Sequence, residues 1–300
     1  MPALAATAPV SASKASWTIL EVLQWTTARF QERGLGSPRL DAELLAAHAF
    51  GLTRVQLYTQ FDRPLLGPEL AAFRELVKRR QAGEPVAYLT GRKEFWSLDL
   101  AVDKRVLIPR PDTETTVEEA LDRLRARPAE QPPRIADVGT GSGAIALALA
   151  KNLPQAAVFA CDVSPDALAV ARDNALRLGL AVTFLEGNLA EPLRAHGPFD
   201  LIAANLPYVR AGDIAGLAPE VRSEPWLALD GGDDGLDLVR ALVAAAPELL
   251  APGGALVLEI GEGQAAATAA LCRAAGLEDV RARADLGGID RVVSGLAVRA

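Results

Sequence analysis

The sequence predicts an α/β protein in which a mostly parallel sheet, with helices on both faces, follows a small helical bundle. Half of the 300 residues are hydrophobic, so the chain can bury a sizeable core and is expected to form two domains. Apolar residues recur at helical spacing up to about residue 83, and short apolar strands alternate with helices after residue 111. Such alternation is typical of a parallel sheet that helices cover on both sides.

The first part of the chain carries helix signals. Residues 1–15 are rich in Ala and Ser and lack the basic start and continuous apolar core of a signal peptide, so a disordered tail is expected there. Further on, Ser37 as N-cap, Pro38 at the first helical position and Gly51 as a stop predict one well-defined helix. We expect a helical domain over residues 16–84.

The second part follows a segment of different character. Residues 85–110 alternate aromatic and β-branched side chains, which predicts a hairpin that links the two domains. The domain expected over 111–300 ends with two strands that only a turn separates, so the last strand should insert antiparallel and bring the sheet to seven strands. The other strands are expected at 134–138, 157–161, 182–186, 200–204 and 255–260, and the helices at 143–152, 165–178, 233–249 and 264–275.

Charge and composition exclude several classes of protein. The net charge is -7 and Lys and Arg form no block, which argues against a protein that wraps nucleic acid or binds an anionic membrane. No apolar run reaches the roughly 18 residues of a membrane span, so a cytoplasmic protein is expected. Two cysteines are too few for a disulfide framework or zinc cluster. The acidic run that starts at Asp230 lacks the spacing of a calcium loop, and no metal site is expected.

A glycine-rich motif, "DVGTGSGAIALALA", follows a strand and opens a helix. Gly139, Gly141 and Gly143 let the backbone come close to a ligand at the helix N-terminus, although this spacing does not separate S-adenosylmethionine from NAD. Asp162 ends the next strand, where its carboxylate can accept hydrogen bonds from both ribose hydroxyls of a nucleoside. A tight turn without ligand, and a charge at a helix start, are the structural alternatives. Together the motif and the acid predict a nucleoside cofactor.

The stretch "ANLPYV" lies at the end of the fourth strand of the second domain, where open α/β sheets bind ligands. Asn205 offers both an acceptor and a donor, so it can bind a planar amide or an aminopyrimidine edge. Leu206 precedes Pro207 and is pushed to an extended backbone, which directs its carbonyl. Tyr208 supplies a flat face for stacking. Such a site suits methyl transfer to a nitrogen with a delocalised lone pair, which needs no strong base.

The sequence resembles the protein-(glutamine-N5) methyltransferases of the HemK or PrmC type. The resemblance covers nearly the whole chain after the tail, through the motifs "GEPVAYLTGRKEFW", "LIPRPDTE", "DVGTGSGAIAL", "CDVSPDALAVARDNA", "NLPYV", "EPWLALDGGDDGLD" and "LEIGEGQ". It implies a class I, Rossmann-like methyltransferase domain with S-adenosylmethionine as cofactor and S-adenosylhomocysteine as product. It further implies bacterial class 1 peptide chain release factors as partners, methylated at the glutamine of their Gly-Gly-Gln motif, with a helical N-terminal domain that helps to recognise them.

The resemblance also implies site residues. It assigns the target glutamine to Asn205, Leu206, Pro207 and Tyr208, and the cofactor to Gly139, Thr140, Gly141, Ser142, Gly143, Asp162, Leu189 and Asn205. The sequence departs from the family pattern in two places: Leu206 replaces a proline, and Asn188 and Leu189 replace an acidic residue and an aromatic one.

Three alternative functions remain open at this point. An adenine-N6 nucleic-acid methyltransferase uses a similar catalytic motif, although the acidic net charge argues against it. A glutamine methyltransferase of a ribosomal protein would share the whole motif. A binding module that keeps the cofactor fold without turnover would be favoured only by the Leu206 departure. No direct contact with nucleic acid is expected.

Overall fold

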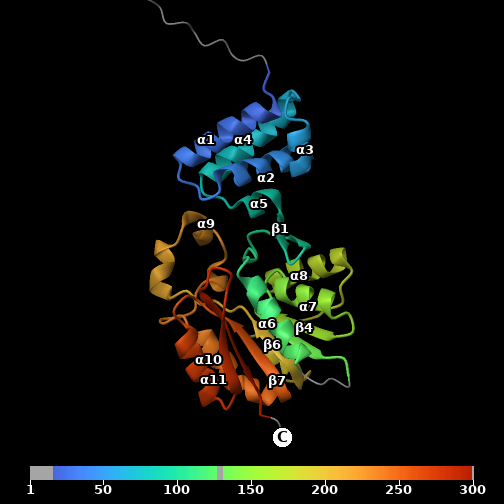
Figure 1. The fold of residues 1–300 in the computed structure, drawn as a ribbon, viewed down its shortest axis with the longest axis vertical. Coiled ribbons are helices and arrows are strands. Elements are labelled where there is room, and N and C mark those ends of the chain that lie inside the picture. The colour runs from blue at the N-terminus through green and yellow to red at the C-terminus, as the bar shows by residue number, and fades with distance from the viewer. Residues whose placement is uncertain (1–15, 127–130, 299–300) are drawn as a thin grey trace, which may run out of the picture. The chain divides into compact units, whose positions relative to one another are not determined.

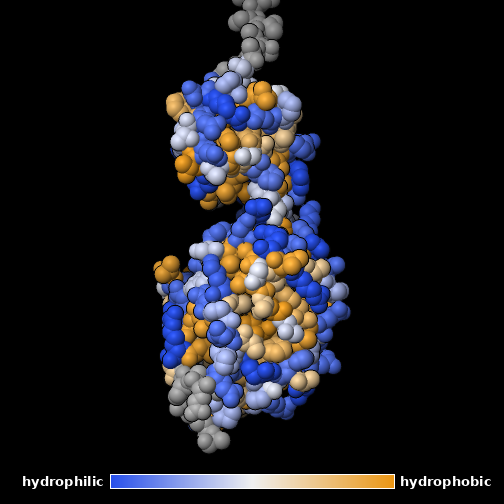
Figure 2. Space-filling view, turned by 90° about the vertical axis from the view of Figure 1, so that its right-hand side faces the viewer, coloured by the Kyte–Doolittle hydropathy of each residue, from blue (hydrophilic) through white to orange (hydrophobic). Residues whose placement is uncertain are grey.

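The structure is a computed structural model that describes residues 16–126 and 131–298. The chain divides into two compact units, the first ending at Thr90 and the second beginning at Gly91 (Figure 1). The tail expected at 1–15 lies outside the described residues. Within these ranges no helix is long and apolar enough to span a membrane. The face of the molecule in Figure 2 mixes hydrophilic and hydrophobic residues, as water-exposed surfaces do.

The first unit is a small bundle of helices around one apolar cluster, as the sequence predicts. Its second helix confirms the predicted bounds, because it begins at Pro38 and stops at Gly51, whose φ of 64° is left-handed. Ser37 holds the N-cap position without a side-chain hydrogen bond. The helices are α1 (Ile19–Glu32), α2 (Pro38–Phe50), α3 (Arg54–Thr59), α4 (Gly67–Gln81) and α5 (Val86–Thr90).

The segment 85–110 differs in part from its prediction. Its first residues form the short helix α5, and the hairpin is confined to β1 (Arg92–Phe95) and β2 (Leu98–Ala101). The turn residues Trp96 and Ser97 have φ of 52° and 54°, the conformation that favours Asn-Gly in a two-residue turn. Distant side chains stabilise this turn: the Trp96 amide donates to Glu114 Oε1 at 3.0 Å, and Lys151 Nζ donates to the Ser97 carbonyl at 3.0 Å.

The second unit is built on a seven-stranded sheet in the order β5-β4-β3-β6-β7-β9-β8. Strands β3 to β7 pair in parallel, whereas β9 pairs antiparallel with both β7 and β8, which confirms the predicted antiparallel insertion. The strands are β3 (Arg134–Val138), β4 (Ala157–Asp162), β5 (Thr183–Glu186), β6 (Phe199–Ala204), β7 (Leu250–Glu259), β8 (Glu278–Ala284) and β9 (Asp290–Leu296).

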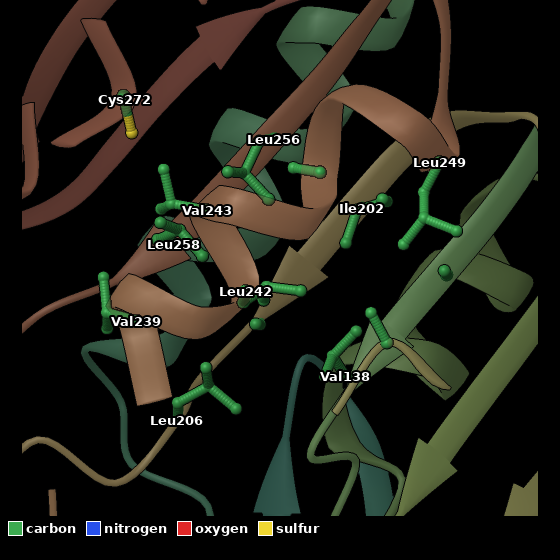
Figure 3. Close-up of a cluster of buried hydrophobic side chains, with 14 of the residues drawn as sticks. Val138, Ile202, Leu206, Val239, Leu242, Val243, Leu249, Leu256, Leu258 and Cys272 are labelled. Carbon is green, nitrogen blue, oxygen red and sulfur yellow. The ribbon is translucent and has the colours of Figure 1, made fainter. Parts of the chain in front are cut away.

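Helices cover both faces of this sheet (Figure 1). Alternate residues of each central strand point to opposite faces. Ile202 and Leu256 belong to the cluster under α10 and α11 (Figure 3), whereas Leu201 and Val257 belong to the cluster with α6 and α7. The helices are α6 (Thr113–Arg125), α7 (Ala144–Asn152), α8 (Pro165–Leu178), α9 (Pro219–Arg222), α10 (Asp237–Leu249) and α11 (Ala265–Ala274), so α10 begins four residues later than predicted.

Candidate active site

A cavity of about 240 Å³ lies at the carboxyl ends of β3, β4 and β6. This edge of the sheet is where parallel α/β folds bind their ligands. The cavity brings together residues that are far apart in the sequence, from the ends of these three strands, from the segment that follows β5 and from the segments 105–107 and 225–228. The site residues implied by the resemblance that line it are Gly139, Gly141, Asp162, Leu189, Asn205, Leu206 and Pro207.

The glycine loop approaches the cavity with its backbone. Gly139, Gly141 and Gly143 have φ of 72°, 55° and 86°, a region that side chains other than glycine rarely occupy. A Cβ atom on Gly139 would lie 3.1 Å from Leu206 Cδ2, so this glycine permits close packing of the two loops. By contrast, nothing lies within 4 Å of a Cβ on Gly141, which therefore borders open space. The loop leaves room for a ligand beside Gly141.

Asp162 is fixed by two backbone amides at the end of β4. Its Oδ2 accepts from the Gly141 amide at 2.9 Å, and its Oδ1 accepts from the Ser164 amide at 2.9 Å. A carboxylate oxygen can accept two hydrogen bonds, so each oxygen keeps capacity for a ligand hydroxyl. The carboxylate thus connects the glycine loop to the start of α8 and also borders the cavity.

Three implied residues of the glycine loop do not line the cavity. Thr140 and Ser142 are buried, and the Thr140 hydroxyl donates to Asp137 Oδ2 at 2.7 Å. Gly143 is the N-cap of α7, where a Cβ would lie 3.0 Å from Leu147 Cδ1. Burial raises the pKa of Asp137 to about 7, and its Oδ1 has no hydrogen-bond partner among the described residues. These residues therefore stabilise the conformation of the loop on its side away from the cavity.

Leu189, at the adenine end of the implied cofactor site, lines the cavity in an unusual conformation. Its φ is 46°, a left-handed value that costs a non-glycine residue about 1–2 kcal/mol. The Cys161 thiol donates to the Leu189 carbonyl at 3.2 Å and so supports this turn. Burial raises the pKa of Cys161 to about 12, which keeps the thiol protonated and able to donate.

The stretch "NLPY" joins the cavity to the core. Asn205 Nδ2 donates to Thr113 Oγ1 at 3.2 Å, and no hydrogen bond to Asn205 Oδ1 is formed within residues 16–126 and 131–298. The Leu206 side chain is only 3% exposed and points into the cluster formed with Val138 and Val239 (Figure 3). This packing, rather than a second proline, stabilises the loop against the core.

Tyr208 is half-buried and does not line the cavity. Burial raises the pKa of its hydroxyl to about 12, so the side chain is neutral. Its backbone carbonyl accepts from Gln264 Nε2 at 3.1 Å, and Gln264 also accepts from the Gly261 amide at 2.8 Å. The loop 230–236 packs close on the same carbonyl, because a Cβ on Gly235 would lie 2.3 Å from it. Glutamine and glycine together hold the loop at Tyr208.

A buried carboxylate lies behind Asn205. Glu259, the last residue of β7, is 2% exposed and accepts a hydrogen bond from the Thr116 hydroxyl at 3.3 Å, and the Thr113 hydroxyl lies beside the same carboxylate. Burial raises the pKa of Glu259 to about 7. The carboxylate therefore lies one side chain away from the Asn205 amide.

A second buried carboxylate anchors the cavity lip. Glu224 accepts from the Ile108 amide at 2.9 Å and pairs with the Arg110 guanidinium, so it ties the segment that begins "EPW" to "LIPRP". Pro225 and Leu227 line the cavity next to this anchor. Glu114 also follows "LIPRP", but it does not anchor the cavity lip: it accepts a hydrogen bond from the Trp96 amide and stabilises the hairpin.

The sequence did not indicate a role at the site for Thr113, Glu224, Glu259 or Gln264. Each lies within one of the motifs that carry the family resemblance, but its contacts are with residues remote in the sequence, and no local pattern reports such pairs. Within the part of the chain that the structure describes, no cluster of His, Cys, Asp and Glu side chains could hold a metal ion.

Two family models match the chain. The model described as the PrmC N-terminal domain matches residues 21–91, and the one described as a methyltransferase domain matches residues 135–223. The catalytic domain of hMettl16, solved in complex with the MAT2A 3'UTR hairpin 6, is 14% identical with a TM-score of 0.55, covering 79% of this chain and 87% of that one. At this sequence identity, the likeness to the hMettl16 domain shows the fold alone.

Full-length relatives are much more similar in sequence. The release factor glutamine methyltransferase of Geobacter sulfurreducens is 50% identical over 280 residues, which cover 93% of this chain and 96% of the relative. That of Moorella thermoacetica is 49% identical over 261 residues, covering 86% and 91%. Identity at this level extends across both compact units. The chain belongs to the family of release factor glutamine methyltransferases.

Proposed function

We propose that this protein transfers a methyl group from S-adenosylmethionine to the side-chain amide nitrogen of the glutamine in the Gly-Gly-Gln motif of bacterial class 1 release factors. The observation that carries the proposal is the Asn205 amide, which borders the same cavity as the glycine loop and Asp162 and has a free acceptor oxygen. A primary amide is a donor that matches this acceptor. The proposed reaction is cytoplasmic, because release factors act there.

The residues at the cavity fit the cofactor. The open space beside Gly141 admits a ligand close to the backbone, and Asp162 retains acceptor capacity for ribose hydroxyls. Gly139 to Gly143 would hold the methionine part and Leu189 the adenine, with Thr140 and Ser142 supporting the loop. When bound, S-adenosylmethionine supplies a methyl group activated by a positively charged sulfur. S-adenosylhomocysteine is the product.

The protein's own residues would hold and orient the substrate amide. Asn205 Oδ1 and the Leu206 carbonyl would accept its two N–H groups, and Pro207 would restrict the direction of that carbonyl. Orientation of this kind converts an encounter into an attack at short distance, which is a large part of the rate enhancement. Tyr208 would support the clamp from its half-buried position behind the loop rather than from the cavity wall.

The described residues supply no strong base to the cavity. Among the described residues that line it, the ionisable ones are Arg105, Cys161 and Asp162, and both oxygens of Asp162 accept backbone amides. A base is not required, because a methylated amide nitrogen carries a very acidic proton that water can accept. The residues therefore act by binding and orientation.

The two units would have different functions. We assign recognition of the release factor to residues 16–84, linkage to 85–110 and methyl transfer to 111–300. The match of residues 21–91 to the PrmC N-terminal domain supports the first assignment. Neither direct nucleic-acid contact nor membrane binding is part of the proposal.

The test is methyl transfer from labelled S-adenosylmethionine to purified release factor, with the product located by mass spectrometry. The matched control is the release factor with its Gly-Gly-Gln glutamine replaced by alanine. A ribosomal protein and duplex DNA complete the set of acceptors. Label on the glutamine alone supports the proposal. Label on DNA adenine or only on ribosomal protein refutes it, as does bound cofactor without transfer to any acceptor.

A further inference from the structure

We infer that Thr113 and Glu259 are positioning residues that set which end of the Asn205 amide faces the substrate. The inference rests on the proposed function, because it concerns the same clamp. It assigns a role in the reaction to two residues that do not line the cavity and that come from different elements, the start of α6 and the end of β7.

The three side chains lie in a continuous row. Asn205 Nδ2 donates to Thr113 Oγ1 at 3.2 Å. The Thr113 hydroxyl lies beside the Glu259 carboxylate and favours its ionised form, against the larger, opposite effect of burial on its pKa. Thr113 and Glu259 are 3% and 2% exposed, so water does not compete for their hydrogen bonds. A buried row of this kind holds its outer member in one rotamer and one orientation.

Glu259 sets the direction from donor to acceptor along this row. An ionised carboxylate only accepts hydrogen bonds, so the Thr113 hydroxyl donates to Glu259. Its oxygen then accepts, and Asn205 must present its NH₂ group to Thr113. Asn205 Oδ1 is thereby turned toward the cavity, where it can accept from a substrate N–H. The row thus selects a substrate that donates, such as a primary amide.

Protonation of Glu259 would remove this selection. A protonated carboxyl can donate to Thr113, whose hydroxyl is then free to donate to Asn205 Oδ1 and to favour the flipped amide. The charged and titratable groups that act on Glu259 are Asp112 at the start of α6 and Arg291 of β9, and Glu259 itself acts on Tyr208 after β6. The productive orientation therefore requires ionised Glu259, and activity should fall as the pH drops through its pKa.

The first experiment compares T113V, T113S and T116V at pH 8.5 with release factor as substrate. T113V removes the hydroxyl at nearly constant volume and should lower kcat/KM by about 10-fold to 100-fold, since a misplaced clamp loses attack geometry. T113S keeps the hydroxyl and should retain activity within about threefold. T116V is the matched control, because it removes a buried hydroxyl that also contacts Glu259 but does not contact Asn205. Calorimetry should show the same S-adenosylmethionine Kd in all three variants.

The second experiment measures kcat/KM from pH 6 to 8.5 for the wild type and E259Q. The wild type should lose activity toward low pH, and E259Q, which cannot ionise, should show a flat profile. Either of two results would overturn the inference: wild-type activity in T113V, or the same pH profile in E259Q and in the wild type. The comparison of E259Q with the wild type tests the inference even if T113V fails to fold. A wild-type protein that methylates no release factor refutes the proposed function instead.

Discussion

Replacing Gly235 by alanine should displace the loop that carries Asn205 and Tyr208. Gly235 has a φ of 78°, and an ideal Cβ there would lie 2.3 Å from the Tyr208 carbonyl oxygen and 2.7 Å from Gln264 Nε2. The Gln264 side chain can rotate away, although it then loses its hydrogen bond to Tyr208. The carbonyl belongs to the backbone and can move only with its loop.

The size of the displacement follows from contact distances. Nonbonded heavy atoms pack at about 3.5 Å, so the carbonyl and the new methyl group must separate by about 1 Å. A misplacement of about 1 Å in a reacting geometry costs roughly 100-fold in rate. The alanine also adopts a left-handed backbone, which lowers the free energy of unfolding by about 1 kcal/mol.

The assay is kcat for methyl transfer to release factor, with S-adenosylmethionine affinity measured in parallel. Gly276→Ala is the matched control, because its φ of 83° imposes the same backbone cost while nothing lies within 4 Å of its Cβ. G235A should lose about 100-fold in kcat and keep its cofactor Kd, whereas G276A should lose only stability. Equal activity of the two variants would refute the view that Gly235 positions the loop.

Three further predictions concern the cavity and the core. Asn205→Ala should lower kcat by roughly 100-fold and change the cofactor Kd by only about threefold, whereas Asp162→Ala should raise that Kd by about 10-fold, since each loses its own hydrogen bonds. Calorimetry showing equal loss of cofactor binding in both variants would contradict this division. Leu206→Ala should lower the free energy of unfolding by about 3 kcal/mol, because the side chain is 3% exposed, and a loss below about 1 kcal/mol in urea denaturation would speak against its packing. The raised pKa of Glu259, about 7 against 4.5, means that the folded state favours the neutral acid, so the free energy of unfolding should fall by about 3 kcal/mol as pH rises from 4.5 to 7. Glu259→Gln should remove this fall in the free energy of unfolding. Denaturation curves of the variant with the same pH dependence as the wild type would contradict the raised pKa of Glu259.

The elements with strong local signals could be predicted from the sequence. The parallel strands β3 to β7 contain short apolar runs, and α2 and α8 begin at Pro38 and Pro165 and end before Gly51 and Gly179. Local periodicity and capping determine these features, since every contact involved is within a few residues. Asn205 could be located in the same way, because an asparagine after a buried strand lies at the ligand-binding edge.

The features that only tertiary structure decided depend on contacts between remote residues. The turn at Trp96 and Ser97 lacks the usual turn residues and is stabilised by Glu114 and Lys151 from two helices. The orientation of the Asn205 amide depends on Thr113, 92 positions earlier in the chain. A side-chain amide has no intrinsic preference for which end faces a cavity, so the sequence by itself determined that an amide stands at this edge, and the packing of α6 and β7 behind it decided which way the amide points.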